Sequence, residues 1–308
     1  MILTVTANPA VDAAYFVDEF TMGEVHRPIR TVITAGGKGL NVSRVASILG
    51  ESVTAMGFLG GSNGEFIKSE VSRLGIKGVF TEVSGETRRN IDIVDSCGRV
   101  GEILEAGPEI SDEEKERFLV SFGEEVKKCD IVCISGSLPR GLDGSFYVEL
   151  IRLAKGNGKK VILDTSGKAL EDGMKAEPFM IKPNLDELKK LFENDFKTDS
   201  EIKDALKSMY DRGIELPFVT LGGDGAMLFD GDKFYKFTIP HVDIKNTVGS
   251  GDSTVGGIAT GLDRGMSFVD AVKLGMACGI ANTQFDQTGT VSRELVEKFY
   301  KEIKIREA

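Results

Sequence analysis

The stretch GLNVSRVASILGESVTAMGF, residues 39–58, joins a helical pattern directly to a strand pattern. Its first part spaces apolar residues as one face of a helix does, at Leu40, Val42, Val45, Ala46 and Leu49. Gly50 comes next, and glycine often follows the last turn of a helix. The apolar run over 52–58 then predicts a buried strand. A helix followed at once by a buried strand is typical of folds in which helices cover a parallel sheet.

The same alternation recurs along most of the chain. Further buried strands are predicted at 2–7, 130–135, 160–164, 178–182 and 216–221, and the last four each precede a plausible helix. Further helices are predicted at 63–75 and, in the last third of the chain, at about 251–264, 267–285 and 292–305. We therefore expect an α/β fold with a doubly wound, mostly parallel sheet.

Three segments break this alternation, because 13–20, 27–36 and 87–107 look extended and contain turns. The turn at Ser96-Cys97-Gly98 suits a hairpin. Such strands do not fit inside a parallel sheet. We expect them to form a small separate β-sheet, either a lid over a site or a dimer surface. Its strands would be inserted at about 13–36 and 87–107 into one domain that spans 1–308.

The composition predicts a globular protein of the cytoplasm. The 308 residues are 41% hydrophobic and 28% charged, and the formal net charge of −10 argues against binding to nucleic acid or to an anionic membrane. No apolar run reaches about 18 residues, and the N-terminus lacks the charged segment of a signal peptide. The four cysteines form no C-x-x-C pair, so we expect reduced thiols. With only two histidines, acid–base work falls mainly to carboxylates and any metal must take oxygen ligands.

The stretch NTVGSGDSTVGG, residues 246–257, predicts a tight turn that opens a helix. The backbone N–H groups of Gly249, Ser250 and Gly251 would be unpaired at the helix N-terminus, where they form an anion hole. Asp252 falls in the first helical turn, where an aspartate is either a helix cap or a functional carboxylate, and the local sequence does not decide. Neither the dinucleotide-binding nor the P-loop glycine pattern is present.

A second glycine turn, AGGKGLNV at 35–42, also opens a helix. Gly37 allows the backbone to approach a ligand closely. Lys38 supplies a positive charge that suits a phosphate, and Asn41 offers a donor and an acceptor to sugar hydroxyls. The alternative is an ordinary turn with a solvated lysine.

Together, residues 35–61 and 246–257 resemble the two signature motifs of the ribokinase-like (PfkB) carbohydrate kinase family. The resemblance runs nearly end to end, since 4–12, 135–142, 181–188 and 219–226 are similar to further landmarks of that family. It implies a single ribokinase-like kinase domain with a lid, and a reaction that uses ATP and Mg²⁺. Within the family the chain is most similar to the kinases of sugar phosphates.

The resemblance implies roles for the residues of both turns. Asp252 would accept the proton of the attacking sugar hydroxyl, and the amides of Gly249, Ser250, Gly251 and Asp252 would stabilise the phosphoryl group in transit.

The resemblance also implies a sugar site between the lid and the main sheet. Asp12 would bind sugar hydroxyls, although a turn residue at a strand end is the alternative. Lys38 and Arg88 would clamp the phosphate already present on the sugar, with Arg89 in solvent unless the two arginines exchange roles. Two weaker candidates on the sugar side are Asn90 and Ser137.

On the nucleotide side, Asn184 and Glu187 form an N-x-x-E pattern at a helix start. In the family this pattern organises Mg²⁺ and the nucleotide phosphates, with Glu187 acting through water. The alternative is a capping box, which the same pattern fits well. Lys182 would face nucleotide phosphate. The residues expected to border the nucleotide are Thr220, Gly222, Gly225 and, near adenine, Asn282.

The motifs divide between two substrates. The segments GETR (85–88), EILEAGPEIS (102–111) and QTG (287–289) look more like kinases of tagatose-6-phosphate, whereas Asn90 after TRR leans toward 1-phosphofructokinase. We favour conversion of tagatose-6-phosphate to tagatose-1,6-bisphosphate over conversion of fructose-1-phosphate to fructose-1,6-bisphosphate. A catalytically silent sugar-phosphate sensor of the same fold is the non-enzyme alternative. The family also implies a homodimer joined through the lid strands.

Overall fold

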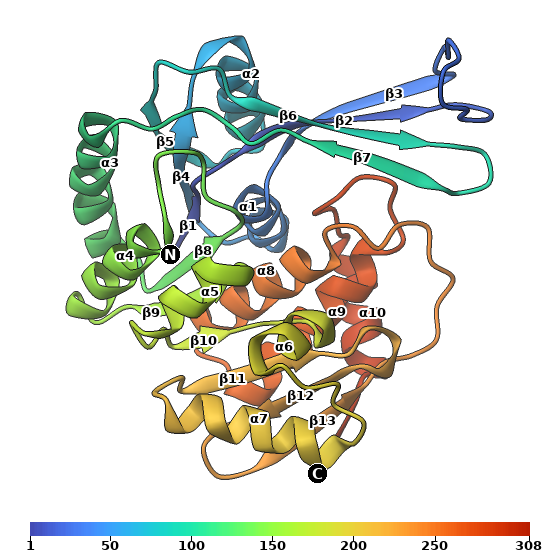
Figure 1. The fold of residues 1–308 in the computed structure, drawn as a ribbon. Coiled ribbons are helices and arrows are strands. Elements are labelled where there is room, and N and C mark those ends of the chain that lie inside the picture. The colour runs from blue at the N-terminus through green and yellow to red at the C-terminus, as the bar shows by residue number, and fades with distance from the viewer.

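Two β-sheets organise the chain, as the computed structural model of residues 1–308 shows (Figure 1). The ten strands of the large sheet lie in the spatial order β14 (Lys304–Glu307), β13 (Phe234–Thr238), β12 (Ala226–Phe229), β11 (Leu216–Thr220), β10 (Met180–Ile181), β9 (Lys160–Asp164), β8 (Ile131–Ser135), β1 (Ile2–Thr6), β4 (Val53–Leu59) and β5 (Lys77–Glu82). The four strands of the small sheet lie in the order β3 (Arg30–Gly36), β2 (Ala10–Phe16), β6 (Arg88–Val94) and β7 (Val100–Leu104).

The large sheet is mostly parallel, as predicted. Every neighbouring pair from β11 to β5 is parallel, whereas β11, β12, β13 and β14 pair in antiparallel fashion at one edge. The prediction of a helix after β11 is therefore wrong. A short 3₁₀ turn, η2 (Gly222–Asp224), is followed by a hairpin that turns at Gly231, whose φ of 98° favours glycine. The last predicted helix also ends early, because residues 304–307 pair with β13 as β14.

Helices cover both faces of the large sheet (Figure 1). They are α1 (Lys38–Leu49), α2 (Gly61–Arg73), α3 (Asp112–Glu125), α4 (Gly144–Gly156), α5 (Gly167–Met174), α6 (Leu185–Phe192), α7 (Asp199–Asp211), α8 (Ser250–Asp263), α9 (Phe268–Asn282) and α10 (Arg293–Glu302), with a 3₁₀ turn η1 (Val126–Lys128). Successive residues of one strand point to opposite faces, so Ile2 joins one hydrophobic core with α1, α8 and α9, and Leu3 joins a second core with α3, α4 and α7. None of the helices combines the length and apolar character needed to cross a bilayer.

The small sheet projects from the body of the molecule as an arm, here called the lid (Figure 1). Its β2 and β6 are parallel neighbours, and β6 turns into β7 through the predicted hairpin, where Gly98 has a φ of 78°. The strand β2 begins at Ala10, three residues earlier than the predicted segment. A cavity of about 220 Å³ lies between the lid and the body, and residues of β2, β3 and β6 line it together with the loops at 245–248 and 286–288.

Candidate active site

The strand register brings the predicted polar clusters to one edge of the large sheet. Because the parallel strands β1, β8, β9, β10 and β11 are consecutive neighbours, their carboxyl ends meet there. Ser135 pairs with Asp164, and the pairing of Ile181 with Leu163 places Lys182 beside Asp164 on the next strand. Ligands bind at this edge in open α/β sheets, which makes it the expected place of a binding site.

Asp252 lies in the first turn of α8 and is 7% exposed. The N-cap of this helix is Gly249, and no side chain caps it. The carboxylate of Asp252 instead accepts a hydrogen bond from Asn41 Nδ2 at 2.8 Å. Asp252 is therefore not the side-chain cap of α8, and its role as a functional carboxylate stays a prediction.

The turn before Asp252 presents backbone donors. The amide of Ser250 donates to Thr247 O at 3.2 Å, whereas those of Gly249, Gly251 and Asp252 have no backbone acceptor. Gly249 has a φ of 79°, which makes the turn possible. A Cβ atom at Gly251 would lie 3.3 Å from Lys182 Nζ, so a lysine ammonium group adjoins these donors. Unpaired amides beside a cation form a site for an anion.

A buried charge cluster surrounds this turn, and its centre, Asp164, was missed by the sequence analysis. Asp164 is 1% exposed, and its Oδ1 lies 3.5 Å from Lys182 Nζ and 3.7 Å from Lys38 Nζ. Burial alone would raise the pKa of Asp164, but the two ammonium groups outweigh it and hold the pKa below its usual value. The only signal in the sequence was an aspartate at the end of an apolar strand.

The cluster sets the basicity of Asp252. Burial, and then the negative charge of Asp164, raise the pKa of Asp252 to about 6. Lys38, the hydrogen bond from Asn41 and Lys182 act in the opposite direction. A carboxylate with this pKa is ionised at neutral pH and is a better proton acceptor than an ordinary aspartate.

A polar pair lies at the base of the lid. Asn90 Nδ2 donates to Asp12 Oδ1 at 2.8 Å, and burial raises the pKa of Asp12 to about 6. A Cβ atom at Gly36, on the neighbouring strand, would lie 1.9 Å from Asp12 Oδ2, so glycine leaves the room that this carboxylate occupies. The pair offers a donor and acceptors of the kind that bind sugar hydroxyls.

Arg88 forms no ion pair, and the negative charges of Asp12 and Glu105 act on it without direct contact. Its guanidinium donates to Asn8 O and Glu105 O, each at 3.0 Å, and to Ser137 Oγ at 3.5 Å. Arg89 instead donates to Asn63 Oδ1 at 2.9 Å from the other face of β6, so the two arginines do not exchange roles. The structure thus brings Ser137 to Arg88, but it joins Lys38 to Asp164.

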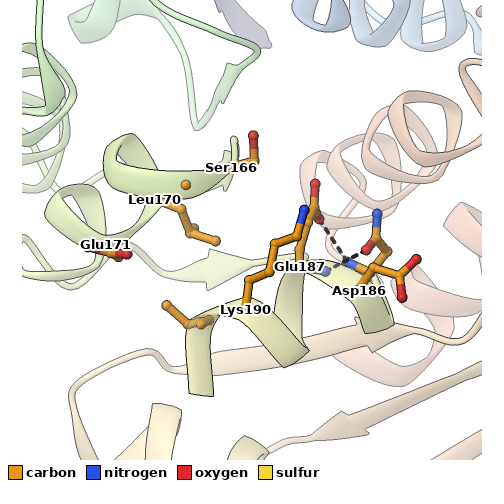
Figure 2. A pocket seen from close by; sticks show the side chains of 9 residues that line it. Ser166, Leu170, Glu171, Asp186, Glu187 and Lys190 are labelled. Carbon is orange, nitrogen blue, oxygen red and sulfur yellow. Dashed lines mark hydrogen bonds between the residues drawn. The ribbon is translucent and has the colours of Figure 1, made fainter. Parts of the chain in front are cut away.

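The N-x-x-E pattern forms a capping box at the start of α6. Glu187 N donates to Asn184 Oδ1 at 2.8 Å, and Asn184 N donates to Glu187 Oε2 at 2.9 Å. Both residues line a cavity of about 380 Å³ between α5 and α6. Ser166 and Lys190 also line it, and Figure 2 shows them with Glu187. Neither Ser166 nor Lys190 was a candidate from sequence.

The carboxylate of Glu187, on the cavity lining, fits a magnesium ion that is held mainly through water and phosphate. No group of three or more histidine, cysteine or acidic side chains is arranged to hold a metal by protein ligands alone. Glu187 lines the cavity, whereas Asp164 is already paired with the ammonium groups of Lys38 and Lys182. Magnesium prefers oxygen ligands and retains much of its water, so few protein ligands suffice.

The remaining nucleotide candidates lie around β11 and α9. Thr220 forms a parallel bridge with Asn184, and the turn that contains Gly222 and Gly225 follows it directly. Asn282 is fully buried, and its Nδ2 donates to Val248 O at 2.9 Å and to Ser250 Oγ at 3.3 Å. Its amide therefore holds the turn before α8 in place, and a contact with adenine stays a prediction.

Comparisons with known proteins agree with this geometry. The chain matches the model described as "pfkB family carbohydrate kinase" over residues 5–294. It is 42% identical over 310 residues to the tagatose-6-phosphate kinase of Staphylococcus epidermidis, with 100% of both chains covered. Phosphofructokinase-2 from Escherichia coli, solved with potassium, has a TM-score of 0.91 at 28% identity, covering 97% of this chain and 98% of that one. Arabidopsis thaliana ribokinase, complexed with ribose and ATP, has a TM-score of 0.80 at 22% identity with the same coverage, which concerns the fold alone.

Proposed function

Because the chain belongs to the pfkB family of carbohydrate kinases and is therefore a phosphotransferase, we propose that it transfers the γ-phosphoryl group of ATP to tagatose-6-phosphate. The product would be tagatose-1,6-bisphosphate. The observation that carries the choice of a phosphorylated sugar is the guanidinium of Arg88, which donates only to neutral oxygens and forms no ion pair, so that an anion can bind to it.

In the proposed reaction, Asp252 accepts the proton of the attacking hydroxyl while the hydroxyl oxygen bonds to the γ-phosphorus and ADP leaves. Such transition states are loose, so catalysis depends mainly on positioning and on neutralising charge. The free amides of Gly251 and Asp252, together with the ammonium groups of Lys38 and Lys182, are available for that charge. The raised pKa of Asp252 suits the proton transfer.

The sugar would lie between the lid and Asp252. Asp12 and Asn90 would bind its hydroxyls, and Arg88 with Ser137 would bind the phosphate that it already carries. Gly37 and Asn41 would border the sugar from α1 and the turn before it. This proposal assigns Lys38 to the transferred phosphoryl group, because its ammonium pairs with Asp164 beside Lys182.

ATP would lie along the carboxyl ends of β10 and β11, with Lys182 and Asn184 facing its phosphates. Thr220, Gly222 and Gly225 would border the nucleotide, and Asn282 would lie near adenine. When bound, Mg²⁺ would neutralise phosphate oxygens, with Glu187 oriented toward it through water. The capping box leaves this role open to Glu187, because only one of its two carboxylate oxygens accepts the bond from Asn184 N.

We also propose that the enzyme is a cytoplasmic homodimer, with 1–308 as a single domain and the lid as the contact surface. Seven of the twelve large hydrophobic residues that are exposed lie on the lid or on the loop at its tip: Met22, Val25, Ile29, Ile33, Val100, Ile103 and Leu104. A surface of this kind is expected to be covered by a partner. The cysteines are free, which fits the cytoplasm.

Substrate choice can be tested by comparing kcat/KM for tagatose-6-phosphate, fructose-6-phosphate and fructose-1-phosphate under the same conditions. We expect the highest value with tagatose-6-phosphate. A clear preference for fructose-1-phosphate would make the chain a 1-phosphofructokinase instead. If none of the three sugar phosphates leads to formation of ADP from ATP, the result would support a sugar-phosphate sensor and contradict the proposal.

A further inference from the structure

Arg44, on α1, is a buried cation without a carboxylate partner. It is 5% exposed, and the three hydrogen bonds that it donates all go to neutral oxygens. Its Nη1 donates to Asn41 Oδ1 and to Thr288 O, both at 2.9 Å, and its Nη2 donates to Ala35 O at 2.7 Å. Burying a charged guanidinium without an anionic partner costs free energy. Three hydrogen bonds that hold such a group in one place therefore indicate a role beyond packing.

The first of these bonds fixes the orientation of the Asn41 amide. Since an arginine only donates, the Asn41 oxygen must face Arg44, and the NH₂ group must then face the other way. On that side Asn41 Nδ2 donates to Asp252 Oδ2 at 2.8 Å. If the amide were flipped, its oxygen would face the carboxylate and the hydrogen bond would become a repulsion.

The other two bonds join this pair to segments that enclose the sugar cavity. Ala35 lies at the base of the lid, where it pairs with Val11 beside Asp12. Thr288 lines the cavity itself. The next residue, Gly289, has a φ of 62°, and a Cβ atom there would lie 2.8 Å from Asn41 Cβ, so the loop packs directly on Asn41. One guanidinium thus contacts α1, the lid base and the cavity loop.

We propose that Arg44 is a positioning residue that acts through Asn41 to orient the carboxylate of Asp252, and that it holds this pair in register with the lid base and the loop at Thr288. The inference rests on the proposed role of Asp252 as the base of a sugar-phosphate kinase. Arg44 touches none of the reacting groups, and its bond to Asn41 is its hydrogen-bonded link to Asp252, so the proposal assigns its main effect on kcat to that bond.

A double-mutant cycle tests this dependence. Arg44→Met and Asn41→Ala are made singly and together, and kcat and KM are measured with tagatose-6-phosphate and ATP. We expect Arg44→Met to lower kcat by about 10- to 100-fold, because small displacements of a catalytic group have effects of that size, while KM changes by less than about threefold. In the Asn41→Ala background the same substitution should change kcat by no more than about twofold. Equal effects in both backgrounds would overturn the proposal.

A matched control is Arg264→Met. Arg264, at the C-terminal end of α8, contacts the C-terminal end of α1, far along both helices from Asn41 and Asp252. Its Nη2 donates to Leu49 O at 2.8 Å, and its Nε donates to Glu51 Oε1 at 2.7 Å. Its loss should lower the melting temperature with little change in kcat. A fall in kcat as large as that of Arg44→Met would mean that any loosening of α1 against α8 suffices, and the proposal would fail.

Arg44→Lys keeps the positive charge but lacks the planar guanidinium that donates to Asn41, Thr288 and Ala35 at once. This variant tests the proposal if Arg44→Met does not fold. It should show the same loss of kcat, and added guanidinium should restore part of the kcat of Arg44→Met. Wild-type kcat in Arg44→Lys would overturn the proposal. Asp252→Asn in the same assay distinguishes a failure of the proposed function from a failure of the role of Arg44. If Asp252→Asn keeps the wild-type kcat, the proposed base is wrong as well. If it is inactive, only the role of Arg44 is in question.

Discussion

Replacement of Asp164 by asparagine should weaken both the fold and the chemistry. Asp164 is the shared partner of Lys38 and Lys182, and Asp164 and Lys182 are almost fully buried. Asparagine keeps the size of the side chain but removes the negative charge. Lys182 would then be a buried ammonium group without an anion, while Lys38, which is 39% exposed, can still turn to water.

The expected loss of stability follows from the burial of the pair. Removing one partner of a buried ion pair typically costs about 3–5 kcal/mol, because the other charge stays buried and unpaired. The pair with Lys182 accounts for most of this, since solvent screens Lys38. Unfolding entropy is about 2.1 cal/mol/K per residue, so for a chain of 308 residues this loss lowers the melting temperature by about 5–8 °C.

The same substitution should move the pH profile of kcat. The negative charge of Asp164 raises the pKa of Asp252, so its removal lowers that pKa from its value of about 6. The base works only when ionised, and kcat therefore falls as the pH drops through this pKa. We expect the midpoint of the acid limb of kcat to lie at lower pH in Asp164→Asn than in the wild type.

Thermal unfolding and a pH series of kcat at saturating substrates check both effects. Asp172→Asn is the matched control, because Asp172 also lies between two lysines, Lys168 and Lys175, but at the surface. Exposed ion pairs contribute little, so this control should leave the melting temperature and the profile unchanged. If Asp164→Asn melted at the wild-type temperature with an unchanged acid limb, the charge cluster would not have the role assigned to it.

Three further outcomes follow from the site. Asp252→Asn should lower kcat by about 10²- to 10⁴-fold with an unchanged circular dichroism spectrum, and near-normal turnover would remove Asp252 from its role as base. Lys38→Met should act mainly on kcat, whereas Arg88→Ala should raise KM for phosphorylated sugars but not for ATP; equal use of free sugars by the wild type would contradict the assignment of Arg88. Light scattering should give the purified protein twice the mass of its chain, and Ile103→Lys, on the exposed lid, should halve it; a wild-type monomer at micromolar concentration would rule out the lid dimer.

The sequence was informative where local chemistry decides the structure. Glycine turns that open a helix, such as Gly249 before α8, and apolar runs such as 131–135 were predictable because backbone freedom and burial act over a few residues. The antiparallel edge was not predictable in the same way. Strands β12 and β14 have four residues each, and the charged segment KIRE resembles a helix end until it pairs with β13.

From the sequence, only those site residues that belong to recognisable motifs could be predicted. Asp164 looks like any aspartate after a strand, and only the register of β8, β9 and β10 places it between two lysines. Arg44 stands among core positions of α1 as a polar residue of no evident use, because its three acceptors come from distant parts of the chain and from one turn earlier in the helix. Tertiary contacts of this kind leave no trace in spacing or composition.

The cations of the site differ in what neutralises them, and this difference suits their proposed tasks. Lys38 and Lys182 share Asp164, so their attraction for an anion is partly satisfied before ATP arrives. Arg88 donates only to neutral oxygens and forms no ion pair, so its guanidinium is available to the phosphate that the sugar carries throughout the reaction. Tight binding of a group that does not react supplies the energy for positioning, whereas tight binding of the reacting phosphates in the ground state would slow the transfer. A site that pairs the lysines next to Asp252 with a carboxylate, but leaves Arg88 without an ion pair, is therefore arranged to hold the substrate by the phosphate that does not react.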